Sequence, residues 1–225
     1  MTLQEKLGHR FQNESLLVQA LTHKSFHNEN GESSPGHNER LEFLGDAVLD
    51  LVLSDLLMQR FPELPEGDLS KIRASFVNEA VLAQMAQEFG LDQYMRLGRG
   101  EILTGGAAKP RILASALEAI IGAYYQDAGF QPSYEWISQL FGSRIDNLDL
   151  SLHFATDYKT RLQELVQERH KEAPRYAVTK SEGPDHEKTF YVDVRIGERV
   201  VASGQGRSKK SAEQEAARVA LESLK

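Results

Sequence analysis

The sequence predicts a two-domain protein: an all-α domain over residues 1–147, a linker over 148–155, and an α+β domain with the order α-β-β-β-α over 156–225. Three observations support this division. Apolar residues recur with a helical period in the first part of the chain. After a polar stretch, the period changes to the alternation of half-buried strands. The charge divides as well, because residues 1–154 carry a net charge of −9 and residues 155–225 a net charge of +2.

The first expected helix follows Asn13-Glu14, a pair typical of an N-cap and an acidic first turn. His23 and His27 have the i, i+4 spacing that metal ligands can have on a helix. No third ligand lies nearby in the sequence, so a structural role is the preferred interpretation. Residues 28–37 are predicted to form a polar loop.

The stretch over residues 38–50, N-E-R-L-E-F-L-G-D-A-V-L-D, organises the rest of the chain. Three carboxylates would project from one face of this helix: Glu39, Glu42 and Asp46. The apolar run that follows, with Leu51 among its buried residues, predicts a core helix that ends at Phe61. Carboxylates at the entrance of a core helix must be paired, protonated or bound to a cation. A solvated acidic face is the alternative interpretation.

Two more helices are predicted next, one capped by Asp68 or Ser70 and one over residues 78–89 that ends at a left-handed Gly90. Residues 98–100, Gly-Arg-Gly, are followed by no third glycine at the required place and preceded by no strand. A dinucleotide-binding loop is therefore excluded.

A second core helix is predicted over residues 112–127, with small residues that allow close helix contact. Ser115 and Glu118 lie on one face of it, and Lys109 and Arg111 just before it are the nearest positive charges. A single Glu in so apolar a stretch needs a partner, which the acids of the earlier helix are not. A divalent cation shared by both helices could serve, and Mg²⁺ or Mn²⁺ prefers such oxygen ligands.

The second domain is predicted to begin with a helix capped at Thr156-Asp157 and to end with a helix capped by Ser208. Three strands are expected between them. The first begins at residues 176–178, the second covers 189–196 and the third covers 199–203. Helices on one face of an antiparallel sheet follow from this order. Lys209 and Lys210 occupy the first turn of the last helix, where the helix dipole disfavours cations. Phosphate binding explains them better than a solvated pair of charges does.

The composition excludes several classes of protein. The 225 residues include no cysteine, so disulfides, thiolate metal sites and cysteine nucleophiles are impossible. The start is polar and unlike a signal peptide, and no apolar run is long enough to span a membrane, so we expect a cytoplasmic protein without membrane association. The net charge of −7 argues against nucleic acid for the chain as one body. Its segregation instead indicates cation binding in the first domain and polyanion binding in the second.

Several of these motifs resemble one known family. N-E-R-L-E-F-L-G-D at residues 38–46 resembles the signature of ribonuclease III, and residues 65–74 and 112–119 resemble two further motifs of that family. Residues 156–225, with Gly-Pro-Asp-His at 183–186 and Ser-Lys-Lys at 208–210, resemble a double-stranded-RNA-binding domain. The resemblance implies a homodimeric, all-helical endonuclease domain. It implies Mg²⁺-dependent hydrolysis of double-stranded RNA, with Mn²⁺ as a substitute, to staggered ends with 5′-phosphates in the processing and decay of rRNA and mRNA precursors.

The same resemblance assigns roles to individual residues. The implied catalytic residues are Glu39, Asp46, Glu66 and Glu118. The implied metal ligands are Glu42, Asp46, Ser115 and Glu118. The implied RNA-binding residues are Thr160, Gln163, Gln167, Gly183, Pro184, His186, Ser208, Lys209 and Lys210. Phe43 is expected to pack into the partner subunit. Ser115 departs from the family pattern, which usually has Asp at this position, so the metal ligands lose one charge.

Two other functions fit parts of the sequence. A binding protein that has lost catalysis would hold structured RNA through the second domain, and Ser115 is the feature in its favour. The five acids kept in the first domain count against it. A Mg²⁺-dependent phosphohydrolase of nucleotides would need the acids but would have no use for an RNA-binding domain.

Overall fold

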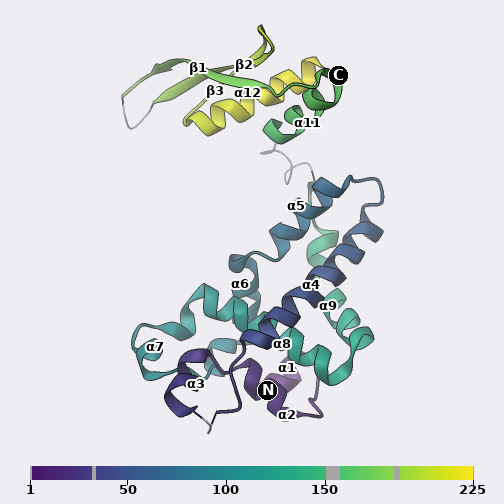
Figure 1. Cartoon of the computed structure of the whole chain (residues 1–225), viewed down its shortest axis with the longest axis vertical. Coiled ribbons are helices and arrows are strands. Elements are labelled where there is room, and N and C mark those ends of the chain that lie inside the picture. The colour runs from purple at the N-terminus through teal and green to yellow at the C-terminus, as the bar shows by residue number, and fades with distance from the viewer. Residues whose placement is uncertain (1, 32–33, 151–157, 185–187, 225) are drawn as a thin grey trace. The chain divides into compact units, whose positions relative to one another are not determined.

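The computed structural model describes residues 2–31, 34–150, 158–184 and 188–224. The chain forms two compact units, residues 1–147 and 148–225 (Figure 1). Most of the expected linker, the expected cap at Thr156-Asp157 and the expected RNA-binding residue His186 lie outside the described residues. Within the described residues, no helix is both long enough and apolar enough to span a bilayer.

The first unit is helical, as predicted. Its helices are α1 (Leu3–Leu7), α2 (Glu14–Ala20), α3 (Lys24–Asn30), α4 (Glu39–Arg60), α5 (Glu66–Phe76), α6 (Glu79–Phe89), α7 (Arg99–Leu103), α8 (Pro110–Ala128) and α9 (Phe130–Asp146). Two short 3₁₀ turns, η2 (Leu91–Gln93) and η3 (Gly106–Ala108), connect α6, α7 and α8. The expected cap at Asn13 accepts a backbone hydrogen bond, Asn78 caps α6 in the same way, and Gly90 ends α6 with φ 71°, as predicted.

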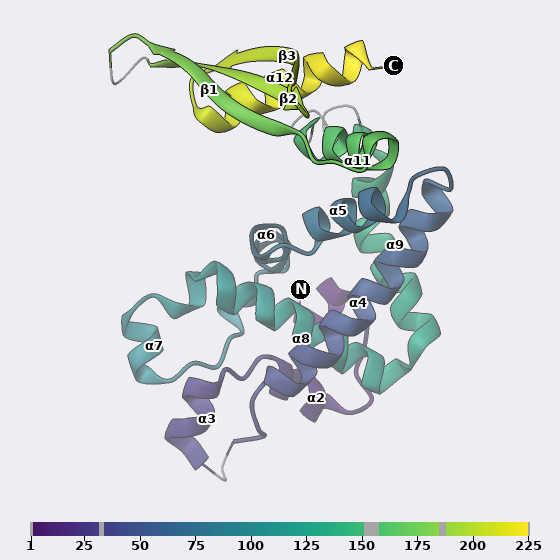
Figure 2. The same ribbon diagram turned by 45° about the horizontal axis from the view of Figure 1, so that its top comes forward.

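The core of this unit is built around α4 and α8, which cross each other (Figure 2). Helix α8 is buried almost throughout, from Ile112 to Tyr124. The two backbones touch at glycines: a Cβ placed on Gly45 would lie 1.8 Å from the carbonyl oxygen of Glu118, and one on Gly122 would lie 2.1 Å from that of Leu41. Only glycine fits at these points, since no side chain can share the space. The crossing therefore brings the acidic start of α4 against the middle of α8.

Several local predictions were wrong. Helix α5 begins at Glu66 rather than after a cap at Asp68 or Ser70, because the extended backbone of Pro65 precedes it and acids already occupy its first turn. Helix α3 continues to Asn30, into the stretch predicted to be a loop. Leu51 is 57 % exposed, so the described residues leave that side of α4 uncovered. Part of the continuous apolar run in the sequence is therefore exposed on the surface of α4.

The second unit has the predicted α-β-β-β-α order. Its elements are α11 (Tyr158–His170), β1 (Arg175–Glu182), β2 (Thr189–Ile196), β3 (Arg199–Gly206) and α12 (Lys209–Ser223). The strands form an antiparallel sheet in the order β1-β2-β3. Alternate residues of β2 and the small face of α12 share one core with α11: Leu162, Val166, Val192, Val194, Ala212, Ala216, Ala217 and Ala220. Strand β3 extends three residues beyond the prediction, because Gly204 and Gly206 let α12 pack directly on its backbone.

Candidate active site

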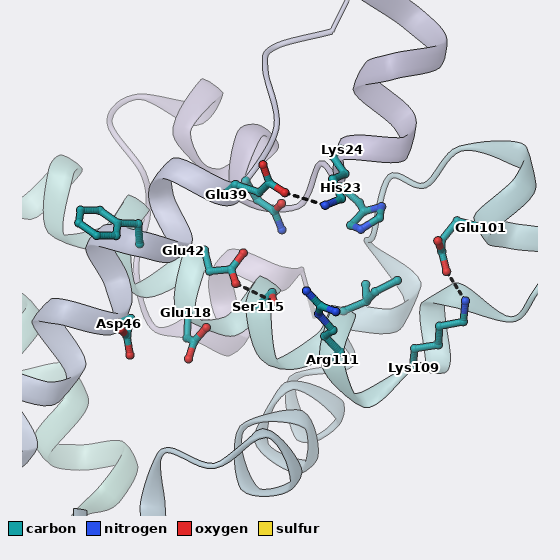
Figure 3. Close-up of a pocket in the computed structure, with 13 residues that line it drawn as sticks. His23, Lys24, Glu39, Glu42, Asp46, Glu101, Lys109, Arg111, Ser115 and Glu118 are labelled. Carbon is teal, nitrogen blue, oxygen red and sulfur yellow. Dashed lines mark hydrogen bonds and ion pairs between the residues drawn. The ribbon is translucent and has the colours of Figure 1, made fainter. Parts of the chain in front are cut away.

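A pocket of about 830 Å³ opens where the start of α4 meets α8 (Figure 3). Acidic and basic side chains from both helices, from α3 and α7 and from neighbouring segments line it. The lining residues are His23, Lys24, Asn38, Glu39, Glu42, Phe43, Asp46, Glu101, Lys109, Arg111, Ile112, Ser115 and Glu118. The structure thus brings together four of the expected acids and Ser115.

The helix crossing explains why these groups meet. Glu42 and Asp46 stand one turn apart on α4, and Ser115 and Glu118 are similarly spaced on α8. Gly45, between the two acids of α4, lies against the backbone of Glu118. The sequence periodicity placed each pair on its own helix, and the glycine contact joins the pairs.

Glu118 is the most perturbed acid of the pocket. Its pKa rises from 4.5 to about 7, chiefly because the half-buried side chain is partly removed from water. The charges of Asp46, Glu42 and Asp50 raise the pKa further. No cation is among the groups that shift it. Near neutral pH, this carboxyl therefore stands between its protonated and its charged form.

Ser115 contacts the acid on the opposite helix. Its hydroxyl donates a hydrogen bond of 2.9 Å to Oε1 of Glu42, and both residues are half-buried. The hydroxyl fixes the direction of the Glu42 carboxylate and keeps its own lone pairs available. Ser115 can therefore orient Glu42 as well as offer a neutral oxygen ligand.

Glu39 is directed away from the other acids. Its carboxylate forms an ion pair of 3.0 Å with Lys24 and lies 3.6 Å from Nδ1 of His37. The hydrogen bond from Lys24 lowers the pKa of Glu39, so this acid stays ionised. The pKa of His23 is lowered by burial, and its ring caps α3 by accepting a hydrogen bond from the Ser25 backbone. This supports the structural interpretation of His23.

Glu66 is the one expected catalytic acid that does not line the pocket. It begins α5, and its carboxylate accepts a hydrogen bond of 2.8 Å from Ser70. Asp50, by contrast, was not predicted as a site residue, but its charge raises the pKa of Glu118. Arg73 reaches from α5 to Asp50 at 3.7 Å and donates to the Ser54 hydroxyl at 2.7 Å. Asp50 lies four residues after Asp46, and this helical spacing could have indicated its place beside the other acids.

Comparison with known proteins gives one consistent assignment. Residues 13–145 match the ribonuclease-III-like family, and residues 158–224 match the double-stranded RNA binding motif. Ribonuclease 3 of Bdellovibrio bacteriovorus is 55 % identical over 98 % of this chain and 94 % of that protein. Ribonuclease 3 of Carboxydothermus hydrogenoformans is 44 % identical over 100 % and 95 % of the two chains. The chain belongs to the ribonuclease III family.

A solved structure supports the fold of the first unit. The nuclease domain of ribonuclease III from Campylobacter jejuni superposes with a TM-score of 0.59 at 44 % identity, covering 65 % of this chain and 96 % of that one. Family membership confirms the enzyme class expected from the sequence motifs, a double-strand-specific endoribonuclease. It also confirms the fold class, a helical nuclease domain followed by a double-stranded-RNA-binding domain.

The predicted RNA-binding residues that the structure describes are accessible. Gln163 and Gln167 are exposed on α11, and Thr160 on the same helix is half-buried. Gly183 and Pro184 are exposed after β1, and Gly183 has a left-handed φ of 94°. The Ser208 hydroxyl caps α12 by accepting from the Ser211 backbone. Lys209 and Lys210 are exposed in the first turn and form no ion pair within the described part of the chain.

The metal ligands and the dimer contact stay predictions. Within residues 2–31, 34–150, 158–184 and 188–224, no three His, Asp or Glu side chains stand close enough together to hold a metal ion in their present conformations. The donors offered by the pocket are carboxylate and hydroxyl oxygens, which suit a hard cation. Phe43, the expected dimer residue, is 80 % exposed on α4. An aromatic ring so exposed is available for a partner.

Proposed function

We propose that the protein hydrolyses phosphodiester bonds of double-stranded RNA at the pocket between α4 and α8, in a reaction that requires Mg²⁺. The observation that carries this proposal is the environment of Glu118. A half-buried carboxyl lies near Asp46 and Glu42, and its pKa is raised to about 7. Such a cluster is unfavourable by itself and becomes favourable when a cation is bound.

The residues of the pocket fit a divalent cation. Glu42, Asp46, Ser115 and Glu118 would hold Mg²⁺, or Mn²⁺ in its place, through oxygen atoms alone. A cation bound there supplies the positive charge that stabilises negative charge on the phosphoryl oxygens of the substrate. Ser115 serves by holding the Glu42 carboxylate in the pocket through its hydrogen bond of 2.9 Å.

The reaction also requires two proton transfers. Hydrolysis adds water to the phosphorus and breaks the bond to the 3′ oxygen, which leaves a 5′-phosphate on one product and a 3′-hydroxyl on the other. One proton must leave the water and one must reach the 3′ oxygen. In the metal-free protein Glu118 has a pKa of about 7, and a bound cation would hold this carboxyl in its charged form, so Glu118 would act as a ligand and not as the group that transfers these protons. Glu39 stays charged beside Lys24 and lines the entrance.

The second unit would hold the RNA duplex. We propose that Thr160, Gln163, Gln167, Gly183, Pro184 and His186 contact 2′-hydroxyls in the minor grooves, while Ser208, Lys209 and Lys210 contact phosphates. Such contacts depend on the shape of the duplex more than on its sequence. We further propose a homodimer in which Phe43 packs into the partner subunit, and a cytoplasmic role in the processing of rRNA and mRNA precursors.

Cleavage of a long RNA duplex across a Mg²⁺ titration tests the proposal. The wild type should give short duplexes with 5′-phosphates, whereas Glu118→Gln should bind the duplex with unchanged affinity and not cleave it. Glu79→Gln is a matched control, because Glu79 is exposed on α6, away from the pocket. A wild type that binds duplex RNA but never cuts it would instead identify a binding protein without catalysis.

A further inference from the structure

Arg111 differs from the other basic side chains of the pocket because it is unpaired. Lys24 is paired with Glu39 at 3.0 Å. Lys109 is paired with Glu101 and also donates to the Thr104 hydroxyl at 2.9 Å. Arg111 is exposed and forms no ion pair or hydrogen bond with any residue that the structure describes. Its guanidinium is therefore free to bind a ligand in the pocket.

The environment of Arg111 favours an anion. Arg111 is the second residue of α8, and the first turn of this helix contains no acid. The positive end of the helix dipole disfavours a cation there, and Lys109 just before the helix adds a second positive charge. A bound anion would relieve both effects. The guanidinium presents paired N–H donors that match a phosphate group.

A second unused donor lines the same pocket. Asn38 is 2 % exposed, and its side-chain Nδ2 has no hydrogen-bond partner among the described residues. A buried amide N–H without an acceptor is costly, so this donor is a second polar group of the pocket that the described residues leave unsatisfied. Two independent donors of the pocket therefore lack acceptors.

The position of Arg111 on α8 decides which phosphate it can reach. Arg111, Ser115 and Glu118 lie on one face of the helix, and Figure 3 shows the guanidinium beside Ser115. With a rise of about 1.5 Å per residue, Arg111 lies about 10 Å along the axis from Glu118. Both side chains lean towards the N-terminus of the helix, so this separation is kept. This separation places Arg111 to one side of Glu118, where a phosphate next to the scissile one would lie.

We propose that Arg111 binds a phosphate next to the scissile one and so fixes the RNA strand along α8. The inference rests on the proposed nuclease function and adds a positioning residue for the substrate. Because the contact is made equally before and during the reaction, its loss should raise KM and leave kcat nearly unchanged.

Steady-state cleavage by the full-length protein in Mg²⁺ provides the first test. Arg111→Ala should raise KM for a short duplex about tenfold, keep kcat within about twofold, and reduce the salt dependence of kcat/KM by about one ion. Arg111→Lys should keep the salt dependence. Arg99→Ala is the matched control, since Arg99 is exposed at the start of α7 and does not line the pocket. Its kinetics should equal those of the wild type.

A duplex carrying a single uncharged methylphosphonate linkage gives the second test, with the linkage moved along the strand on both sides of the cut. At one flanking position it should raise KM of the wild type and leave KM of Arg111→Ala unchanged. Equal responses of the two proteins at every position would overturn the proposal. So would an unchanged KM in Arg111→Ala, or a loss confined to kcat. A wild type that cuts no duplex at all would overturn the proposed function itself, which separates the two failures.

Discussion

Glu118 illustrates how a single half-buried acid can influence the response of a protein to pH. Its pKa in the folded state, about 7, exceeds its ordinary value of 4.5. The folded protein therefore binds more protons than the unfolded chain between these two pH values. The contribution of Glu118 to stability is complete below the lower value and is lost as the pH rises through the upper one.

We predict that the melting temperature of the metal-free protein falls as the pH rises from 5 to 8, and that Glu118→Gln reduces this dependence. Added Mg²⁺ should raise the melting temperature of the wild type more at pH 8 than at pH 6, because only the charged carboxylate holds the ion. Thermal unfolding in EDTA and in Mg²⁺ measures both effects. Equal pH dependence in wild type and variant would contradict the position assigned to Glu118.

Ser115 provides a second prediction at the scale of one residue. Ser115→Asp adds a charged oxygen beside Glu42, so the Mg²⁺ concentration for half-maximal cleavage should fall about tenfold. The melting temperature without metal should also fall, because like charges are then closer together. Ser115→Ala is the matched comparison, since it removes the hydrogen bond to Glu42 and adds no charge. If Ser115→Asp does not change the Mg²⁺ concentration for half-maximal cleavage, Ser115 is not part of the metal site.

At the scale of elements, the crossing of α4 and α8 controls the site. Gly45→Ala would place a methyl group 1.8 Å from the Glu118 carbonyl oxygen, so the helices must separate. We expect a loss of at least about 1–3 kcal/mol in unfolding free energy, together with a lower cleavage rate. Gly142→Ala in α9 is the control, because a Cβ there meets nothing within 4 Å. That variant should gain about 0.5–1 kcal/mol from the better helix former.

The start of α12 provides another prediction at this scale. Replacing Lys209 and Lys210 together by Ala should weaken duplex binding and reduce its salt dependence by about two ions, one for each lost phosphate contact. Binding measured between low and high salt checks this. Lys180→Ala, which removes a β1 lysine already paired with Glu182, should change the salt dependence less. An unchanged slope in the double variant would refute the phosphate role.

The sequence predicted most elements but not how their charges pair. Periodicity located the buried faces of α8, β2 and α12, because an apolar side chain can lower its free energy only by facing the core. Caps at Asn13 and Ser208 were readable, since the capping oxygen acts within three residues. The ion pair between Lys24 and Glu39 could not be predicted, because the two residues lie on different helices whose relative position the sequence pattern does not show. Glu66 was expected near the other acids and instead begins α5, outside the pocket.

At the scale of the whole molecule, α4 carries an exposed apolar stripe that its own unit leaves uncovered. Phe43, Leu51 and Met58 are 80 %, 57 % and 62 % exposed, and their spacing places them along one side of the helix. Large apolar side chains exposed along one side of a helix are typical of an interface. It supports the proposed dimer.

We predict that Phe43→Ala weakens the dimer by about 2–4 kcal/mol, the cost of truncating a central interface aromatic. Sedimentation over a range of protein concentrations measures the change. Leu103→Ala, at an even more exposed leucine on α7, should leave the association unchanged. If the Phe43 variant forms a dimer as tight as that of the wild type, Phe43 does not pack into the partner subunit.

The backbone contact at Gly45 and Gly122 has one more consequence, which concerns how freely the pocket can be altered. Two helices in main-chain contact keep their separation whatever side chains project from them nearby. Evolution or an engineer can therefore exchange one oxygen donor for another at position 115 without rebuilding the scaffold. The glycines are the fixed part of the site, and the choice of ligand is the variable part.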